Sequence, residues 1–135
     1  MSWIYNGELV EDCGEYIGFV YIITCLANNK KYIGKKNFYF AKTKQVKGKK
    51  KRYKVESDWK TYYGSNDELN EHVELFGEKK FKREILRLCK SKGEMTYFEA
   101  KYQFEYGVLE NDKWYNTWIM CKVRKNHLTF LKKGV

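Results

Sequence analysis

The stretch GFVYIITCLANNKKYIGKKNF, residues 18–38, decides the fold. Its first eight residues are rich in β-branched and aromatic side chains and predict a buried strand. Asn28 and Asn29 follow, and asparagine tolerates the positive φ angles that a tight turn needs. The run KYIGK, residues 31–35, resumes as a second short strand, so the stretch predicts a β-hairpin.

Downstream of this hairpin the patterns of a helix, a strand and a second helix follow in turn. Ser65 with Glu68 fits a capping box, and Gly77 suits a helix end, which predicts a helix over about 65–77. The run FKREILRLC, residues 81–89, predicts a third strand, and residues 96–109 predict a second helix. We therefore expect an α+β fold with a small three-stranded mixed or antiparallel sheet, whose N-terminal hairpin is flanked by helices.

Length and composition place the chain among ordinary folded domains. A length of 135 residues suits one domain, and 43% hydrophobic with 18% aromatic residues is too much apolar surface for a disordered chain. The sequence has no proline, no low-complexity linker and no internal repeat, so a single domain over 1–135 is expected. No apolar run is long enough to cross a bilayer, and the first residues are acidic and polar, so we expect an intracellular protein without a signal peptide or membrane segment.

The four cysteines do not predict a metal site. Cys13, Cys25, Cys89 and Cys121 contain no CxxC pair, and only two histidines accompany them. Four unpaired, mostly buried thiols in a reducing compartment are expected instead.

The positive charge is concentrated in one quarter of the chain. The net charge is +10, and residues 30–60 hold 13 Lys or Arg against two acids, Glu56 and Asp58. A basic insertion at about 37–57 is therefore expected to form an exposed hairpin or a mobile loop, and a short basic tail ends the chain. The insertion is either a solvated loop that aids solubility or a surface for a polyanion. Interleaved aromatic rings favour nucleic acid over a membrane surface.

The hairpin resembles the two-part signature of the GIY-YIG nucleases. Phe19-Val20-Tyr21 stands in its first half and Tyr32-Ile33-Gly34 matches its second. The runs KKYIGKKNF, ESDWKTYYGS and FKREIL and a late YN extend the resemblance to about residue 119, and are most like the Seg-type phage proteins of that superfamily. The resemblance implies a DNA endonuclease that uses Mg2+ or Mn2+ and is encoded by a phage or mobile element. Its partner would be double-stranded DNA, with a homodimer as a route to double-strand cleavage.

The resemblance also implies roles for Tyr21, Tyr32 and Asn116. Tyr21 would be the general base, Tyr32 would orient the water or the phosphate, and Asn116 would help to hold the substrate backbone and the site together. A phenol has a pKa near ~10, so positive charge from Lys31, Lys35 or Lys36 would have to lower it or carry the proton onward. From the residues alone, ordinary core packing of both tyrosines and a turn position for Asn116 stay open.

Glu99 is the candidate metal ligand. One carboxylate with waters is a usual way to hold magnesium, and the resemblance favours this role. From the residues alone the alternative is a capping box, since Thr96 and Glu99 lie three apart before an apolar helix.

One departure from the family concerns the phosphate clamp. The superfamily usually places an arginine on the helix after YIG, whereas Gly34 is followed here by two lysines and an asparagine. Lys36 and Lys60 are the candidate replacements, although lysine lacks the bidentate geometry of arginine. A nucleic-acid-binding protein that has lost efficient catalysis therefore stays open as an alternative. The expected DNA contacts are Lys35, Lys36, Lys49, Lys50, Lys51, Arg52 and Lys60.

Overall fold

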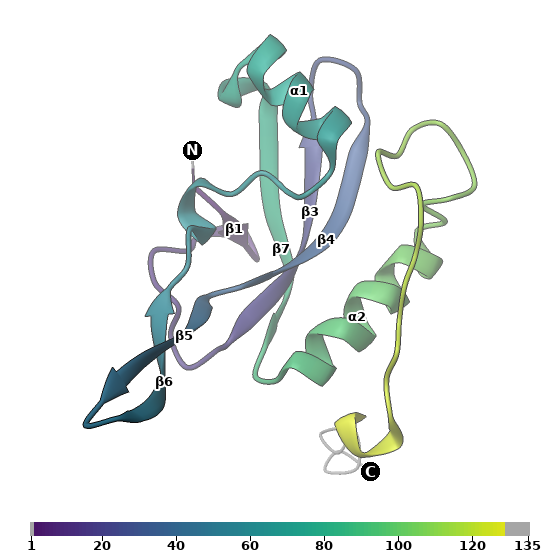
Figure 1. Ribbon diagram of the computed structural model, residues 1–135. Helices are drawn as coiled ribbons and strands as arrows, with labels where there is room; N and C mark the ends of the chain where they lie inside the picture. The colour runs from purple at the N-terminus through teal and green to yellow at the C-terminus, as the bar shows by residue number, and fades with distance from the viewer. Residues whose placement is uncertain (1, 129–135) are drawn as a thin grey trace.

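Strand β3 (Gly18–Cys25) lies in the middle of the three long strands in the computed structural model, which describes residues 2–128 (Figure 1). It pairs antiparallel with β4 (Lys31–Asn37) on one side and with β7 (Phe81–Cys89) on the other. Seven of its eight residues are buried, because both faces of the sheet are covered. The predicted hairpin and the predicted third strand are confirmed.

The sheet has five strands, so the expected number of three was wrong. Strands β1 (Ile4–Tyr5) and β2 (Glu8–Leu9) form an N-terminal hairpin, and β1 pairs parallel with β7 to give the order β2-β1-β7-β3-β4. Asn6 and Gly7 both have positive φ, at 51° and 81°, as a two-residue hairpin turn requires. Strands of two residues are too short to show an alternation of apolar and polar residues, which is why the sequence did not reveal them.

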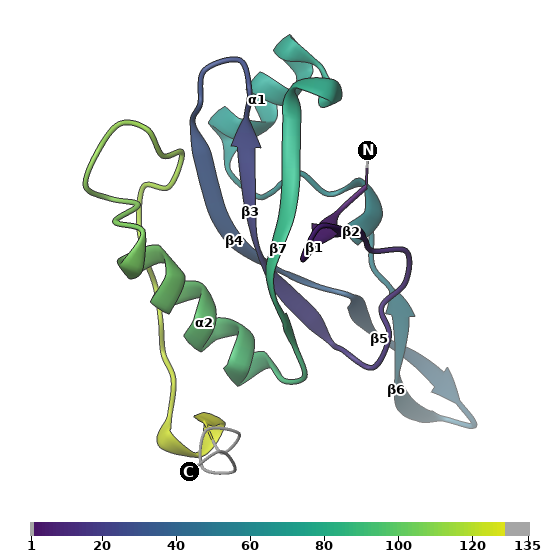
Figure 2. The ribbon, with the colours of Figure 1, turned by 180° about the vertical axis from the view of Figure 1, so that it is seen from behind.

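The basic insertion forms a two-stranded ribbon rather than a mobile loop. Strand β5 (Tyr39–Val46) pairs antiparallel with β6 (Lys49–Glu56) in a sheet of its own. Lys47 and Gly48 have φ of 52° and 78°, and two consecutive positive values make the tight turn that matches strand twist. The ribbon projects away from the main sheet beyond the end of β4 (Figures 1 and 2).

Both helices begin at positions other than those expected. Helix α1 (Asp67–Phe76) is capped by Asn66, whose side chain accepts a hydrogen bond of 2.9 Å from the Leu69 N–H, so Ser65 is not the cap. Helix α2 (Lys92–Glu105) starts four residues before the predicted position, because Ser91 accepts from the Glu94 N–H at 3.1 Å. Glu99 therefore lies inside the helix, which excludes the capping box that the sequence left open. Three short 3-10 helices complete the elements, η1 (Trp59–Thr61), η2 (Glu78–Lys80) and η3 (Lys125–Leu128).

The two faces of the sheet carry separate hydrophobic clusters. Helix α2 covers the face of Val20, Ile22 and Ile33, whereas η1 and α1 cover the face of Phe19 and Tyr21. On the second face Trp3 and Trp59 are buried, and the indole N–H of Trp3 donates to the Trp59 carbonyl at 2.7 Å. Each fully buried side chain of this size stabilises the fold by about 1.5–3 kcal/mol.

All four cysteines are free, as expected. Cys13, Cys25 and Cys89 are buried, and burial raises the pKa of the Cys89 thiol to about 12. A thiol that stays protonated is a poor nucleophile and a poor metal ligand.

Neither helix within residues 2–128 combines the length and the apolar character that crossing a membrane requires. The last seven residues of the predicted basic tail lie outside the described residues.

Residues 113–116 cover the outer edge of β4. The Lys31 N–H donates to the Lys113 carbonyl at 3.0 Å, and the Tyr115 N–H donates to the Lys31 carbonyl at 2.8 Å. The Asn116 side chain then continues the pairing, because its Oδ1 accepts from the Ile33 N–H at 3.1 Å and its Nδ2 donates to the Ile33 carbonyl at 2.9 Å. One amide side chain thus takes the place of a neighbouring peptide at a strand edge.

We expect Asn116→Ala to lower the free energy of unfolding by about 1–3 kcal/mol, because the buried Ile33 N–H loses its acceptor. Urea denaturation measures this cost. The control is Asn126→Ala, at an exposed position of η3, which should change the stability by less than about 0.5 kcal/mol. Equal costs for the two substitutions would contradict the assigned role.

Candidate active site

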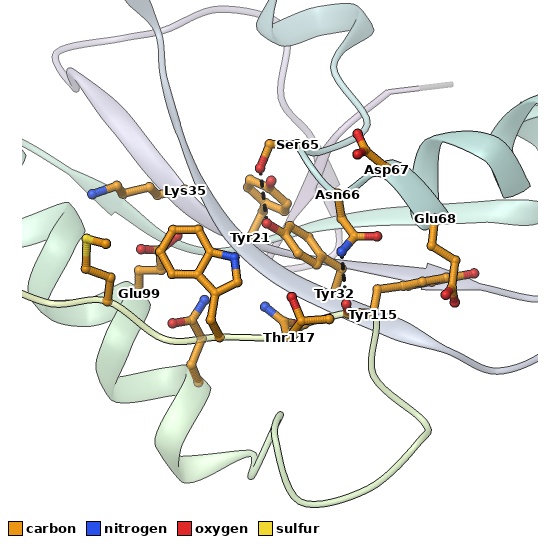
Figure 3. Close-up of a pocket in the computed structure, with 14 residues that line it drawn as sticks. Tyr21, Tyr32, Lys35, Ser65, Asn66, Asp67, Glu68, Glu99, Tyr115 and Thr117 are labelled. Atoms are coloured by element: carbon orange, nitrogen blue, oxygen red, sulfur yellow. Dashed lines mark hydrogen bonds between the residues drawn. The ribbon is translucent and has the colours of Figure 1, made fainter.

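A cleft of about 620 Å3 opens beside the outer edge of β4 (Figure 3). Its walls come from β3 and β4, from the start of α1, from α2 and from residues 115–120. Five of the residues predicted from the sequence line it: Tyr21, Tyr32, Lys35, Glu99 and Asn116. Segments almost one hundred residues apart in the sequence meet here.

Tyr21 reaches the cleft because Gly34 has no side chain. The two residues lie directly opposite each other in the β3–β4 pair, and the Tyr21 ring passes over Gly34 toward the strand edge. A Cβ atom at Gly34 would lie only 2.7 Å from Tyr21 Cζ. Gly64, with φ of 92°, approaches the same hydroxyl from the loop before α1, where a Cβ would lie at 3.4 Å. The glycine of YIG is therefore a steric requirement of the tyrosine on the neighbouring strand.

Burial keeps the Tyr21 phenol protonated. The side chain is 1% exposed, and the rings of Trp3, Tyr62 and Tyr32 surround it at centroid distances of 5.1, 6.1 and 6.2 Å. Its pKa is raised well above the usual value, first because burial removes water from the phenolate and further because Tyr62, Tyr32 and Glu99 would add negative charge. The lowering expected from neighbouring lysines is not found in the chain by itself.

Tyr32 lies on the same face of β4, two residues before Gly34. Its hydroxyl is 3.2 Å from Ser65 Oγ, and this hydrogen bond joins β4 to the loop before α1. Burial raises the pKa of Tyr32 also, while the bond to Ser65 offsets part of the rise.

Glu99 enters the cleft from the middle of α2. Burial raises the pKa of its carboxyl, and the positive charge and main-chain N–H of Lys35 offset part of that rise. Lys35 Nζ donates to Thr96 Oγ1 at 2.9 Å, which holds the ammonium beside the same helix. Among the titratable side chains that line the cleft, Lys35 is the cation that acts on Glu99.

Gln103 lies one helical turn after Glu99, and its side chain is buried. Its Nε2 donates to the Ile33 carbonyl at 3.0 Å, which fixes the orientation of the amide. Its Oε1 is buried and has no hydrogen-bond partner among residues 2–128. Because that oxygen is buried, the Glu99 carboxylate is the oxygen ligand that α2 offers to the cleft.

A single carboxylate in the cleft fits a hard divalent ion that keeps most of its waters. Residues 2–128 contain no group of three or more His, Cys, Asp or Glu side chains that could hold a metal. Magnesium is usually held by one or two carboxylates, with water or substrate in the remaining positions. A tightly caged ion such as structural zinc does not fit this ligand set.

The two lysines expected to replace the family arginine lie outside the cleft. Lys36 Nζ binds Asp58 at 2.6 Å and stands 4.1 Å above the Tyr62 ring. Lys60 lines a separate hollow of about 240 Å3 beside Trp3 and Trp59. The remaining predicted DNA contacts, Lys49, Lys50, Lys51 and Arg52, are exposed on β6.

No arginine within residues 2–128 lines the cleft. Arg83 is buried instead and donates through Nη1 to the main-chain carbonyls of Lys60 and Tyr62, at 3.1 and 2.9 Å. It fixes the loop that leads to Gly64, so its role in the structure is to position that loop.

Sequence reasoning missed several lining residues. Tyr115 is buried, its hydroxyl lies 2.7 Å from His72 Nδ1 and its carbonyl accepts from Asn66 Nδ2 at 2.9 Å, which joins α1 to the C-terminal segment (Figure 3). Burial raises the pKa of Tyr115 to about 12. Trp118 is 64% exposed at the cleft wall. An exposed tryptophan is a surface signal, but only the fold shows which surface it belongs to.

Comparison with known proteins gives one result. The family model described as "Putative endonuclease segE, GIY-YIG domain" matches residues 3–119. Neither a curated protein nor a solved structure matches the chain. The match begins at Trp3, fifteen residues before the hairpin, and so includes the N-terminal strands that pack beside β7.

We expect Gly34→Ala to lower the free energy of unfolding by about 1–3 kcal/mol, because the added methyl overlaps the buried Tyr21 ring. The double variant with Tyr21→Leu is the control, measured by urea denaturation. In the leucine background the alanine should cost less than in the native background, since the Tyr21 ring is gone and only the contact with Tyr32 Cε2, at 2.9 Å, remains. An equal cost in both backgrounds would show that the ring is not the reason for the glycine.

Proposed function

Since the chain belongs to the GIY-YIG domain family of the putative endonuclease segE, we propose that it hydrolyses phosphodiester bonds of DNA with the help of a divalent metal ion. The observation that carries the proposal is one cleft that gathers Tyr21, Tyr32 and Glu99 from three separate elements. The resemblance to Seg-type phage proteins supports an origin in a phage or a mobile element.

Glu99 is the proposed metal ligand, because its carboxylate lines the cleft. Mg2+ or Mn2+ bound here would neutralise the charge that grows on the phosphoryl group and would make a bound water more acidic. The Glu99 carboxyl must lose its proton to bind a metal ion, and the positive charge of Lys35 favours the charged form.

Tyr21 is the proposed general base. In the free chain its raised pKa keeps it neutral, so it accepts a proton only when positive charge enters the cleft and stabilises the phenolate. Tyr32 stands beside it, and its bond to Ser65 holds the hydroxyl in one direction, as orienting a water or a phosphate oxygen requires.

Lys35 is the proposed phosphate clamp within the cleft, in place of Lys36 and Lys60. Its ammonium neutralises a phosphate as a point charge. The exposed ring of Trp118 offers a surface on which a sugar or base can pack. A single cleft cuts one strand, so cleavage of both strands of a double-stranded substrate needs a homodimer or two separate events.

A second candidate function is nucleic-acid binding without efficient cleavage. The absence of an arginine from the cleft lining within residues 2–128 favours it, because a lysine cannot make the bidentate contact to phosphate. Only a cleavage assay separates the two.

We expect the protein to nick supercoiled plasmid in Mg2+ or Mn2+ and to stop in excess EDTA. Glu99→Ala and Tyr21→Phe should each slow nicking by about 100-fold or more, as loss of a metal ligand or a general base does. The control is Glu105→Ala, at an exposed position of α2, which should nick at the native rate. Nicking that survives both site substitutions would overturn the site, and no nicking with either metal would contradict the nuclease and favour the second candidate.

The charged carboxylate of Glu99 should also lower the free energy of unfolding at neutral pH. A carboxyl whose pKa is raised in the fold binds its proton more tightly than in the unfolded chain, so stability present at low pH is lost as pH rises through the raised pKa. Glu99→Gln stays uncharged, and we expect it to be more stable than the native protein at pH 8 by on the order of 1 kcal/mol. The difference should vanish below the usual glutamate pKa of about 4.3.

Thermal melts across pH measure this effect. Mn2+ should raise the Tm of the native protein and leave that of Glu99→Gln unchanged, because ligand binding stabilises the folded state only where a site exists. The exposed Glu105→Gln is the matched control and should follow the native curve. A Glu99→Gln variant that is less stable than the native protein at pH 8 would contradict the buried-charge interpretation.

A further inference from the structure

The two faces of the β5–β6 ribbon differ in chemistry. Residues directly opposite each other in an antiparallel pair point to the same face, and the pairs Lys42↔Tyr53, Lys44↔Lys51 and Val46↔Lys49 therefore share one. This surface, here called the lysine face, consists of Phe40, Lys42, Lys44, Val46, Lys49, Lys51, Tyr53 and Val55. The opposite face carries Tyr39, Ala41, Thr43, Gln45, Lys50, Arg52, Lys54 and Glu56.

The exposed large apolar side chains of the ribbon all lie on the lysine face. Phe40, Tyr53 and Val46 are 41%, 38% and 36% exposed, whereas the opposite face has small or polar residues apart from the half-buried Tyr39. Lys44 Nζ stands 5.4 Å from the centre of the Tyr53 ring. Cations interleaved with exposed rings are the combination that binds a nucleic acid, since the lysines meet phosphates while the rings pack on sugars or bases.

The lysine face also destabilises the ribbon itself. Lys44 and Lys51 are direct cross-strand neighbours, and like charges in that position destabilise a pair of strands. The ribbon pairs with no other strand within residues 2–128, so no sheet compensates for this repulsion. A polyanion lying on the lysine face removes it.

A continuous set of contacts leads from the cleft to this face. The Tyr62 ring packs edge-on against Tyr21, and Lys36 Nζ lies 4.1 Å from the centre of the Tyr62 ring and 4.9 Å from that of Phe40. Phe40 is the first residue of the lysine face. Tyr39 follows Gly34 by only five positions, so at most about 18 Å of chain joins the cleft to the ribbon. That distance is about half a turn of B-form DNA, whose repeat is about 34 Å, so one duplex can contact both.

We propose that the β5–β6 ribbon is a docking arm that lies in the major groove of double-stranded DNA with its lysine face toward the bases. The proposal rests on the proposed function for the choice of DNA as the ligand. The major groove of B-form DNA, about 12 Å wide, admits a two-stranded ribbon, whereas the minor groove, about 6 Å wide, accepts one only when the duplex is deformed. Within the groove Lys44 and Lys51 can donate to guanine, and Val46 can contact a thymine methyl.

Binding of a labelled duplex of 25 base pairs to the whole chain in EDTA tests the arm without cleavage. Two double variants are matched, since each removes two positive charges from the ribbon: Lys44→Gln with Lys51→Gln on the lysine face, and Lys50→Gln with Arg52→Gln on the opposite face. Measured by fluorescence anisotropy, the lysine-face variant should bind about tenfold or more weakly, and its slope of log affinity against log salt should fall by about 2. The opposite-face variant should change that slope by less than about 1. Equal effects of the two variants would overturn the lysine face as the docking surface.

Groove ligands test the second half of the proposal. Methyl green, which occupies the major groove, should displace the protein from the duplex, and distamycin, which occupies the minor groove, should not. The reverse order, or tighter binding to a single strand of the same sequence, would overturn docking in the major groove. Far-UV circular dichroism should show native folding of both variants, and removal of the Lys44–Lys51 repulsion favours it.

The plasmid nicking assay separates this proposal from the proposed function. A native protein that nicks in Mg2+ while its binding is indifferent to the lysine face refutes the docking arm and leaves the nuclease intact. A native protein that binds duplex through the lysine face but never nicks supports the arm and refutes the nuclease.

Discussion

The site depends on one close approach, that of the Tyr21 ring across the backbone of Gly34. A side chain on the middle strand normally stays above its own strand, because the side chain of the neighbouring residue on the next strand blocks its way. The missing Cβ at Gly34 lets the Tyr21 phenol extend across β4 to the edge of the sheet. Gly64 closes the approach from the other side, and Arg83 holds the loop that carries it. The aromatic cluster on this face therefore both stabilises the fold and directs one hydroxyl into the cleft.

The main-chain N–H and carbonyl groups at the outer edge of β4 find hydrogen-bond partners although no further strand among the described residues lies beside them. The Ile33 peptide is satisfied by the side chains of Asn116 and Gln103, one from the C-terminal segment and one from α2. Both amides line the cleft, so the groups that protect the strand edge also form its wall. Tyr21 and Glu99 are meanwhile held with raised pKa values, because burial removes the water that would favour their charged forms. The main-chain groups of the wall at Ile33 therefore have hydrogen-bond partners, whereas Tyr21 and Glu99 are held in a state that a ligand would change.

The sequence predicts the part of this protein that depends on local patterns. The β3–β4 hairpin, β7, the two helices and the concentration of charge follow from periodicity and turn residues, and the resemblance brings Tyr21, Tyr32, Glu99 and Asn116 to attention. The N-terminal strands are not predicted, because a strand of two residues is too short to show a hydrophobic period. Ser65 and Thr96 mimic helix caps, and the true caps at Asn66 and Ser91 are decided by the loops that precede them. The separation of Lys36 and Lys60 from the cleft depends on tertiary partners such as Asp58 that no spacing reveals.

The late position of Asn116 in the chain affects when, during synthesis, the cleft can be completed. Strands β3 and β4 are made early, and the hairpin between them is a local contact that forms fast. The hydrogen bonds between Ile33 and Asn116 span 83 residues, so the edge of β4 stays open until that asparagine has left the ribosome. A nascent chain therefore displays both signature tyrosines without a finished cleft, and during synthesis it exposes a bare strand edge at which self-association can begin.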